Sequence, residues 1–157
     1  MVDFSIYESG NGGDLLIVND DIALADSLLQ LVYLCLFGGN IESSTNGNER
    51  PNELRSDWWA NSLLFGVNRG KQFNSLTERT LKNTPLSSSG RVAIQSAVDQ
   101  DLSELRIIAD IKSEVIIKTN NRVEISIKLN KYKGKEDVSF QFLWNGIDES
   151  VILTKKI

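Results

Sequence analysis

The chain has 157 residues, of which 41% are hydrophobic and 24% are charged, a composition typical of a globular protein with its own core. Its formal net charge of −4 argues against general affinity for nucleic acid, because binding to phosphates needs a basic surface. The sequence has no histidine and one cysteine, Cys35. Histidine-dependent catalysis, an internal disulfide and a structural zinc site are therefore excluded.

The charges are distributed unevenly along the chain. Residues 1–104 hold 7 Lys or Arg against 14 Asp or Glu, a net of −7, whereas residues 105–157 hold 10 against 7, a net of +3. Solvated strand faces explain this difference, and the alternative is complementarity between unlike faces of neighbouring subunits. The first residues do not resemble a signal peptide, and the longest apolar run, Leu31–Phe37, is too short to span a membrane. We therefore expect a protein made in the cytoplasm that does not contact a membrane.

The first part of the chain predicts a β-hairpin followed by an apolar helix. Residues 3–8 alternate apolar and polar side chains and can pair with residues 14–18 across a glycine-rich turn. A helix is expected over 21–37, capped by Asn19 or Asp20 and ended by two glycines. Apolar residues cover most of this helix, so we expect it to lie at the centre of the fold.

A long polar loop, residues 40–57, precedes two adjacent tryptophans, Trp58 and Trp59. Neighbouring side chains diverge in a strand or a helix, so both rings cannot serve one core. We predict that one ring covers the core and that the other lies at a subunit contact; the alternative is that both pack as a lid. Arg50 and Arg55 of the loop are further candidate interface residues.

The rest of the chain predicts helices followed by an antiparallel meander. A short helix or an irregular segment follows the tryptophans, and a Ser-x-x-Glu capping box at Ser75 begins a second helix. Apolar spacing near residue 90 then indicates a third helix, and alternation beyond residue 105 indicates strands. We expect helices over 76–83 and 90–104 and strands near 106–118, 122–131, 137–144 and 150–154. The predicted fold is α+β, a single domain over 1–157 with helix 21–37 packed on the meander.

No group of residues has the arrangement that catalysis requires. The acidic residues Asp99, Asp101 and Glu104 resemble a glycosidase or Mg²⁺ site only in composition. The segment GVNRGK, residues 66–71, is one residue short of a phosphate-binding loop, and no hydroxyl follows its lysine. We therefore predict that the chain is not an enzyme and needs no cofactor or metal.

The order of three sequence stretches resembles a known family. They are GGDLLIVNDDIALADSLLQLVYLCLFGG, then RSDWWAN after the polar loop, then RGKQFNSLTERTL. This order resembles the baseplate wedge protein of Mu-type contractile-tailed phages, which is similar to the sheath-initiating wedge protein of T4-type phages. The resemblance covers roughly residues 12–144. The chain departs from the family pattern at Ser56-Asp57, where small residues are usual, and at Ala60-Asn61, where Gly-Asp is usual.

The resemblance implies a non-catalytic virion protein of the tail baseplate, assembled in the cytoplasm of the bacterial host. Its implied partners are a larger baseplate wedge scaffold protein, the tail sheath protein, and the tail hub or tube. Nucleic acid and membranes are not expected partners. The alternative is a small adaptor or inhibitor-type module of the same fold class, which also binds proteins. The two differ in gene neighbourhood, because a wedge protein is expected beside a gene for a large scaffold protein.

The C-terminal segment, residues 149–157, is the predicted site of contact with a partner. An antiparallel meander leaves an open edge, to which a foreign strand can add. Val151 and Leu153 are candidate interface residues on this segment, and Lys155 and Lys156 deter indiscriminate pairing. We predict that a strand of a sheath or wedge partner adds to the C-terminal sheet. The alternative is that the segment covers its own sheet edge or frays.

Overall fold

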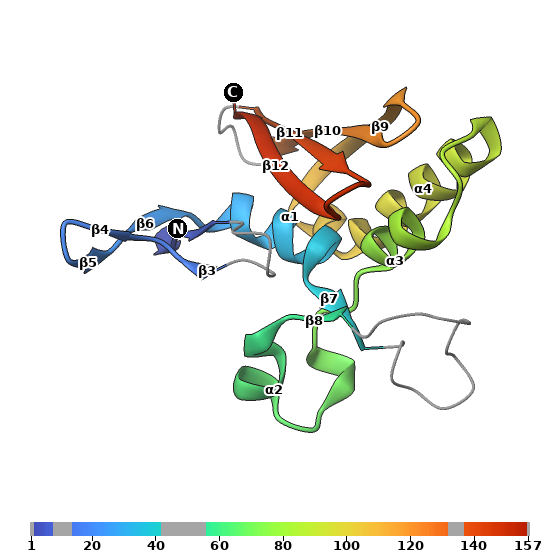
Figure 1. The fold of residues 1–157 in the computed structure, drawn as a ribbon. Coiled ribbons are helices and arrows are strands. Elements are labelled where there is room, and N and C mark those ends of the chain that lie inside the picture. Colours follow the sequence, from blue (N-terminus) through green and yellow to red (C-terminus); the bar gives the residue numbers. More distant parts are fainter. Residues whose placement is uncertain (1, 8–13, 42–55, 132–136, 157) are drawn as a thin grey trace. The chain divides into compact units, whose positions relative to one another are not determined.

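The computed structural model describes residues 2–7, 14–41, 56–131 and 137–156 (Figure 1). The described strands pair antiparallel and are separated by helices, so the predicted α+β class is confirmed. The chain divides into two compact units, Met1–Arg79 and Thr80–Ile157. Two predictions concern both units together: that residues 1–157 form a single domain, and that helix 21–37 packs on the meander. Both stay predictions.

The N-terminal unit begins with a small arm of short paired strands, in which the predicted hairpin between the first two strands is confirmed. We call the described residues between 2 and 26 the N-terminal arm. Its strand segments are β1 (Val2–Phe4), β2 (Ile6–Tyr7), β3 (Asp14–Leu15), β4 (Ile17–Val18), β5 (Asp21–Ile22) and β6 (Leu24–Asp26).

The arm consists of three chain segments, which hold β1 and β2, β3 and β4, and β5 and β6. Each segment pairs with both of the others: β2 with β3, β4 with β5, and β1 with β6. Three backbone hydrogen bonds form a closed ring where the partners change. The Ser5 N–H donates to the Ala23 carbonyl at 2.7 Å, the Ala23 N–H to the Leu16 carbonyl at 2.8 Å, and the Leu16 N–H to the Ser5 carbonyl at 2.8 Å. This ring satisfies backbone groups that a flat three-stranded sheet would leave at its edges.

The predicted helix start near Asp21 is wrong. Asn19 and Asp20 have φ angles of 52° and 62° and connect β4 to β5. These angles fit a two-residue hairpin turn, in which both central residues have positive φ. Asn and Asp favour helix N-caps and tight turns alike. Strand pairing decided between the two, and the helix begins only at Ser27.

Helix α1 (Ser27–Phe37) is largely buried and ends where the sequence predicts. A Cβ atom on Gly38 would lie 2.2 Å from the Leu34 carbonyl oxygen and 2.8 Å from the Phe73 Cβ, so only glycine fits there. Gly39 has a φ of 85°, a conformation that glycine adopts without Cβ strain. The first glycine therefore allows close packing, and the second allows the turn out of the helix.

Two short strands, β7 (Gly39–Asn40) and β8 (Ser56–Asp57), pair with each other at the two ends of the predicted polar loop. Residues 42–55 of that loop lie outside the described residues. Helix α2 (Trp59–Phe65) follows, which settles the choice between a helix and an irregular segment. After a 3₁₀ turn at Arg69–Lys71, helix α3 (Leu76–Asn83) has the predicted bounds.

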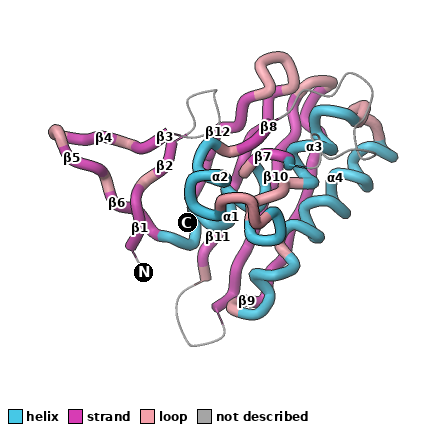
Figure 2. Tube along the Cα trace, turned by 90° about the horizontal axis from the view of Figure 1, so that it is seen from below, coloured by secondary structure: helices cyan, strands magenta, loops and turns pink. Residues whose placement is uncertain are grey.

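The C-terminal unit contains helix α4 (Ser88–Asp101) and a four-stranded antiparallel sheet (Figure 2). Ser87 caps α4, because the Gly90 N–H donates to its Oγ at 3.2 Å. The helix ends before the predicted residue 104, since a 3₁₀ turn at Ser103–Ile107 follows it. The strands are β9 (Ala109–Thr119), β10 (Arg122–Lys131), β11 (Val138–Asn145) and β12 (Ser150–Lys156), in the order β12-β11-β10-β9. The predicted meander and its last strand are thus confirmed.

The sheet has one buried face and one wet face, as its alternating sequence predicts. On the buried face Ile125 lies opposite Phe142, and Ile127 lies opposite Phe140. The intervening side chains are partly buried or, like Lys128 of β10, exposed, and they form the wet face. These cross-strand apolar pairs form the core of the C-terminal unit.

Candidate functional site

Trp58 packs inside the N-terminal unit. Its side chain is 8% exposed and clusters with Leu34 and Ala60. The ring meets that of Phe73 edge-on, with centroids 5.7 Å apart. Its Nε1–H is buried and has no hydrogen-bond partner among the described residues. Trp58 therefore stabilises the unit by ring packing rather than by a hydrogen bond.

Trp59, the first residue of α2, is 51% exposed, although its ring centroid lies 5.8 Å from that of Trp58. Leu63 lies one helical turn further along the same side of the helix and is exposed, as are Leu64 and Val67. We call Trp59, Leu63, Leu64 and Val67 the α2 surface. One tryptophan is thus buried and the other is largely exposed. The contact of Trp59 with another subunit stays a prediction.

A buried asparagine, Asn61, fixes the position of α2. It is fully buried, and its side-chain amide forms a two-way bridge with the backbone of Phe73. The Phe73 N–H donates to Asn61 Oδ1 at 2.9 Å, and Asn61 Nδ2 donates to the Phe73 carbonyl at 2.9 Å. Asn61 Nδ2 also lies 3.5 Å from the Gly38 carbonyl. The amide thus links α2 to the segment before α3 and to the end of α1.

The first turn of α3 also binds the end of α1. Ser75 forms the predicted cap, since the Glu78 N–H donates to Ser75 Oγ at 3.0 Å. Ser75 Oγ also donates to the Leu36 carbonyl, and the Ser75 N–H donates to the Gly39 carbonyl at 2.7 Å. The Glu78 carboxylate accepts from the Gly39 N–H at 3.1 Å. The sequence showed the capping box, but not that it binds a turn 39 residues earlier.

Replacing Asn61 by alanine should lower the free energy of unfolding by about 2–4 kcal/mol. The substitution leaves the N–H and C=O of Phe73 without their partners in a part-buried position, and unmade hydrogen bonds of this kind cost about 1–3 kcal/mol each. Thermal and urea unfolding measure the change. The matched control is Asn74→Ala at an exposed asparagine of the same unit, which should change stability by less than about 0.5 kcal/mol. Equal effects of the two substitutions would contradict the assigned role.

The predicted interface residues of the C-terminal segment both lie on β12, whereas Arg50 and Arg55 lie outside the described residues. Val151 lies opposite Trp144 and is buried, so its side chain belongs to the core of the sheet itself. Leu153 is 40% exposed. Of the two, Leu153 alone presents side-chain surface to a partner.

The backbone of β12 forms an open sheet edge. Hydrogen-bonded and non-hydrogen-bonded residue pairs alternate across antiparallel strands. The Val115 N–H of β9 points away from β10, so Val115 and its partner on β10 are not a hydrogen-bonded pair. When this alternation is followed across β10 and β11 to β12, the N–H and C=O groups of Val151 and Leu153 point away from β11. No strand lies on that side of β12 among the described residues. We call the outer side of Ser150–Leu153 the β12 edge.

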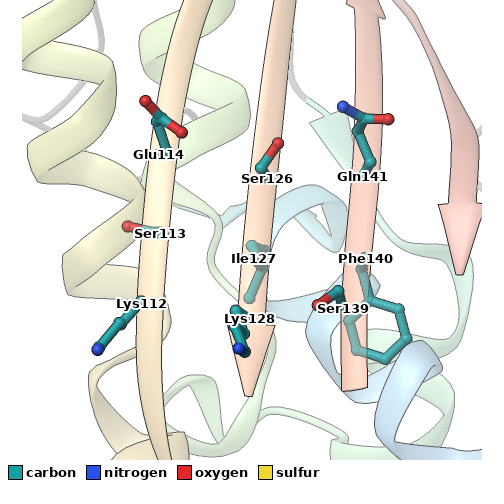
Figure 3. Close-up of a pocket in the computed structure, with 9 residues that line it drawn as sticks. All are labelled: Lys112, Ser113, Glu114, Ser126, Ile127, Lys128, Ser139, Phe140 and Gln141. Carbon is teal, nitrogen blue, oxygen red and sulfur yellow. The ribbon is translucent and has the colours of Figure 1, made fainter. Parts of the chain in front are cut away.

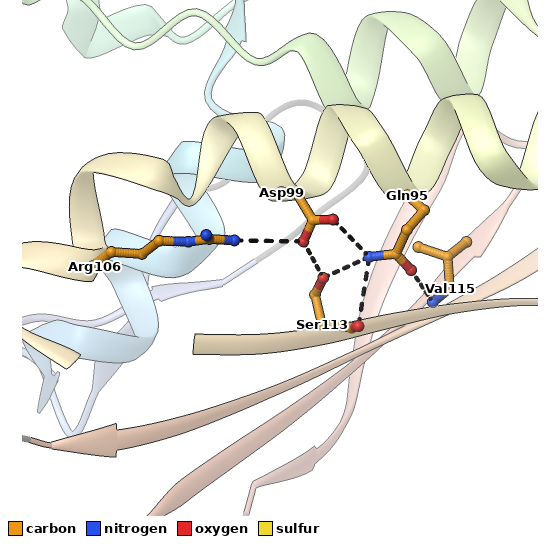
Figure 4. Close-up of polar contacts among 5 residues, drawn as sticks. All are labelled: Gln95, Asp99, Arg106, Ser113 and Val115. Carbon is orange, nitrogen blue, oxygen red and sulfur yellow. Dashed lines mark hydrogen bonds and ion pairs between the residues drawn. The ribbon is translucent and has the colours of Figure 1, made fainter. Parts of the chain in front are cut away.

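A side chain of α4 covers the middle of the opposite edge of the sheet (Figure 4). The Val115 N–H of β9 donates to Gln95 Oε1 at 2.9 Å, and Gln95 Nε2 lies 3.4 Å from the Ser113 carbonyl and 2.6 Å from its Oγ. The Gln95 amide thus takes the place of a peptide group in a neighbouring strand. Such coverage blocks the pairing of a foreign strand with β9 at Ser113–Val115.

Asp99 holds this glutamine in position. Its carboxylate accepts from Gln95 Nε2 at 3.3 Å and from Ser113 Oγ at 2.6 Å, and Arg106 Nη2 lies 4.0 Å from it (Figure 4). The sequence indicates only that Gln95 and Asp99 lie on one side of a helix, four residues apart. Their partner Ser113 belongs to a strand, so the closed edge follows from the tertiary structure alone.

The wet face of the sheet holds an open groove of about 340 Å³ across β9, β10 and β11 (Figure 3). Lys112 of β9 and Lys128 of β10 lie directly opposite one another in it. Glu114 is the one carboxylate among its lining residues. A glycosidase needs two facing carboxylates, so the groove does not have that arrangement.

Comparison with protein-family models, with curated proteins and with solved structures found no match to this chain. Within the described ranges, no three acidic, histidine or cysteine side chains gather as a metal site would require. The helices there are also too short, or too polar, to cross a membrane. The features that remain as a candidate site are the α2 surface and the β12 edge.

Proposed function

We propose that the chain is a non-catalytic wedge subunit of a contractile phage tail baseplate, which links the hub and the wedge scaffold protein to the first ring of sheath. The order of its sequence motifs supports this role by resemblance. The observation that supports it most is the unequal treatment of the two sheet edges: Gln95 covers β9, while β12 is open. If avoiding aggregation were the only requirement on this sheet, covering both of its edges would be favourable.

The proposed contact at this edge is strand addition. An extended segment of the sheath or wedge partner pairs with β12 through the outward N–H and C=O groups of Val151 and Leu153. Backbone hydrogen bonds supply the affinity, and the exposed Leu153 and Ile152 side chains supply contacts on the two faces. The α2 surface is the second proposed contact, with Trp59 as its anchor, because tryptophan buries a large rigid area at little cost in entropy.

Leu153→Pro tests the strand addition. Proline removes the outward N–H and adds a ring on the open side, while the hydrogen bonds to β11 stay intact, so the unit should fold with its melting temperature changed by only a few degrees. Purified sheath protein from the same contractile system should polymerise when seeded by the wild-type chain, but not when seeded by this variant. Leu153→Ser is the matched control: it loses the same side chain, keeps the N–H, and should still seed.

Normal seeding by a folded Leu153→Pro variant would reject the β12 edge as the contact. Deletion of residues 149–157 is a less clean test, because it also removes Val151 from the core beside Trp144. A deletion that abolished seeding would therefore not separate loss of the edge from loss of the fold.

In the alternative function, the chain is a small adaptor or inhibitor-type module, and the same surfaces bind another partner. A tagged copy of the chain, produced in the bacterial host, separates the two. A wedge subunit should be recovered in purified contractile particles, at the baseplate end. An adaptor should be stably produced and absent from them. A neighbouring gene for a large baseplate scaffold protein would support the wedge, and an isolated gene would support the adaptor.

A further inference from the structure

The N-terminal unit has two exposed apolar surfaces that differ in charge, and the first of them is the N-terminal arm. Ile17 lies opposite Ile22, and Phe4 lies opposite Leu24. Their exposed fractions are 67%, 40%, 54% and 63% in that order. Ribbons as short as β4–β5 are barely stable alone in water, and clustered exposed apolar residues mark an interaction site. The arm therefore presents apolar pairs for a partner to cover.

The charge at the tip of the arm is acidic. Asp20 and Asp21 are exposed at the turn between β4 and β5. The described residues 2–7 and 14–41 contain no lysine or arginine that would balance them. A surface that covers the arm must therefore be apolar and must supply cations of its own. Nucleic acid and anionic membranes carry the wrong charge for this contact.

The α2 surface is the second exposed apolar surface, and its charge is the opposite one. Its four side chains are between 51% and 99% exposed. Arg69 and Lys71, in the 3₁₀ turn that follows α2, are exposed as well. Residues 58–77, all of which the structure describes, contain no aspartate or glutamate. The α2 surface is thus apolar and bordered by cations, which is the chemistry that the arm requires.

The loop after α2 is ordered by its own contacts. Gln72 Nε2 donates to the Gly66 carbonyl at 2.7 Å, and the ring of Phe65 meets that of Phe73 with centroids 6.2 Å apart. Val67 follows Gly66 directly in this loop and is 99% exposed. An apolar surface that is already ordered loses little conformational entropy when a partner binds. The α2 surface is therefore prepared for docking.

We propose that the N-terminal arm of one copy docks on the α2 surface of a second copy. The apolar pairs of the arm cover Trp59 and its apolar neighbours, and the aspartates at the arm's tip approach Arg69 and Lys71. Both surfaces are exposed within one copy, so a second copy brings them together. Because two different surfaces meet, the contact is heterologous and repeats from copy to copy.

This inference rests on the proposed function in one respect, because it names the occupant of the proposed α2 contact. It makes no use of the β12 edge, through which the chain is proposed to seed sheath. Association of the chain with itself and seeding of sheath are therefore separate measurements, and either can fail alone.

Sedimentation velocity of the full chain, with no other protein present, tests the contact. The wild-type chain should associate with rising concentration, and added salt should weaken the association. Ile17→Thr with Ile22→Thr removes an apolar pair of the arm, while threonine keeps the preference for strands. Leu63→Gln with Val67→Thr removes apolar area from the α2 surface, while glutamine keeps a high helix propensity. Each double variant should raise the dissociation constant about tenfold or more.

The matched control is Ile147→Thr. Ile147 is 72% exposed, much like Ile17, but it lies in the C-terminal unit and outside both surfaces. This variant should associate like the wild type. The Leu63→Gln, Val67→Thr variant should also melt within a few degrees of the wild type, because both of its side chains are largely exposed. Its weaker association is then not an effect of unfolding.

Mixing the two double variants gives the sharpest result. One retains its α2 surface and the other its arm, so the mixture should associate at a concentration at which neither variant associates alone. A wild-type chain that stays monomeric at every concentration would overturn the proposal, and normal seeding of sheath by that chain would leave the proposed function standing. A mixture that stays monomeric, or a control that dissociates as the variants do, would overturn the proposal equally.

Discussion

Replacing Phe140 by aspartate should prevent the C-terminal sheet from folding. Phe140 is one of the largest fully buried side chains and lies opposite Ile127 at the centre of the sheet. Loss of a buried phenylalanine costs about 3–5 kcal/mol, and a buried carboxylate without a partner adds several more. The sum is about the whole stability of a domain of this size, roughly 5–15 kcal/mol. The expected result is insoluble protein, or soluble protein without a cooperative thermal transition.

The neighbouring Ser139→Asp is the control for this substitution. Its side chain lies on the wet face, directly opposite Lys128, so the new charge meets water and an opposite charge. This variant should melt within a few degrees of the wild type. A Phe140→Asp variant with the same melting temperature would contradict the assigned core.

Leu29→Asp tests the expected packing of helix 21–37 in the same way. Leu29 lies in the first turn of α1 and is only partly buried, and an acidic residue near a helix N-terminus is favoured by the helix dipole. We therefore expect a smaller loss of stability than for Phe140→Asp. An unchanged melting temperature would contradict packing of this part of the helix on the meander.

Alanine substitutions of the two tryptophans should have opposite consequences. Trp58→Ala removes a buried ring from the cluster with Leu34 and Phe73, and should lower the free energy of unfolding by about 3–5 kcal/mol. Trp59→Ala removes a largely exposed ring, and should cost less than about 1 kcal/mol while it weakens assembly with the wedge partner. Thermal unfolding of the free chain and its recovery in contractile particles measure the two effects separately.

Trp58→Phe sharpens this comparison. Because Nε1–H of Trp58 has no partner among the described residues, phenylalanine should retain much of the packing and cost clearly less than alanine. A phenylalanine variant as unstable as the alanine variant would show that the donor matters. If Trp59→Ala reduces only the stability of the free chain, both rings pack as a lid and the interface role of Trp59 is rejected.

The sequence by itself determined the elements whose periodicity has one interpretation. The alternation from Val123 to Leu129 fits only a strand with one buried face, and the Ser75–Glu78 spacing fits a helix start. Glycine at 38 and 39 likewise ends a helix whatever surrounds it. These signals are local, because they depend on residues only a few positions apart, and their predicted bounds agree with the structure.

The tertiary structure decided whatever depends on a partner far along the chain. Asn19-Asp20 is suited both to a helix cap and to a hairpin turn, and the pairing of Ile22 with Ile17 selected the turn. Gln95 closes the β9 edge only because Ser113 and Val115 lie beside it. Likewise, Trp58 is the buried ring of the pair because Asn61 and Phe73 fix the start of α2. Hydrogen bonds and packing between residues far apart in the chain lower the free energy of one local conformation relative to its alternative. A sequence pattern does not show which distant residues will lie close together.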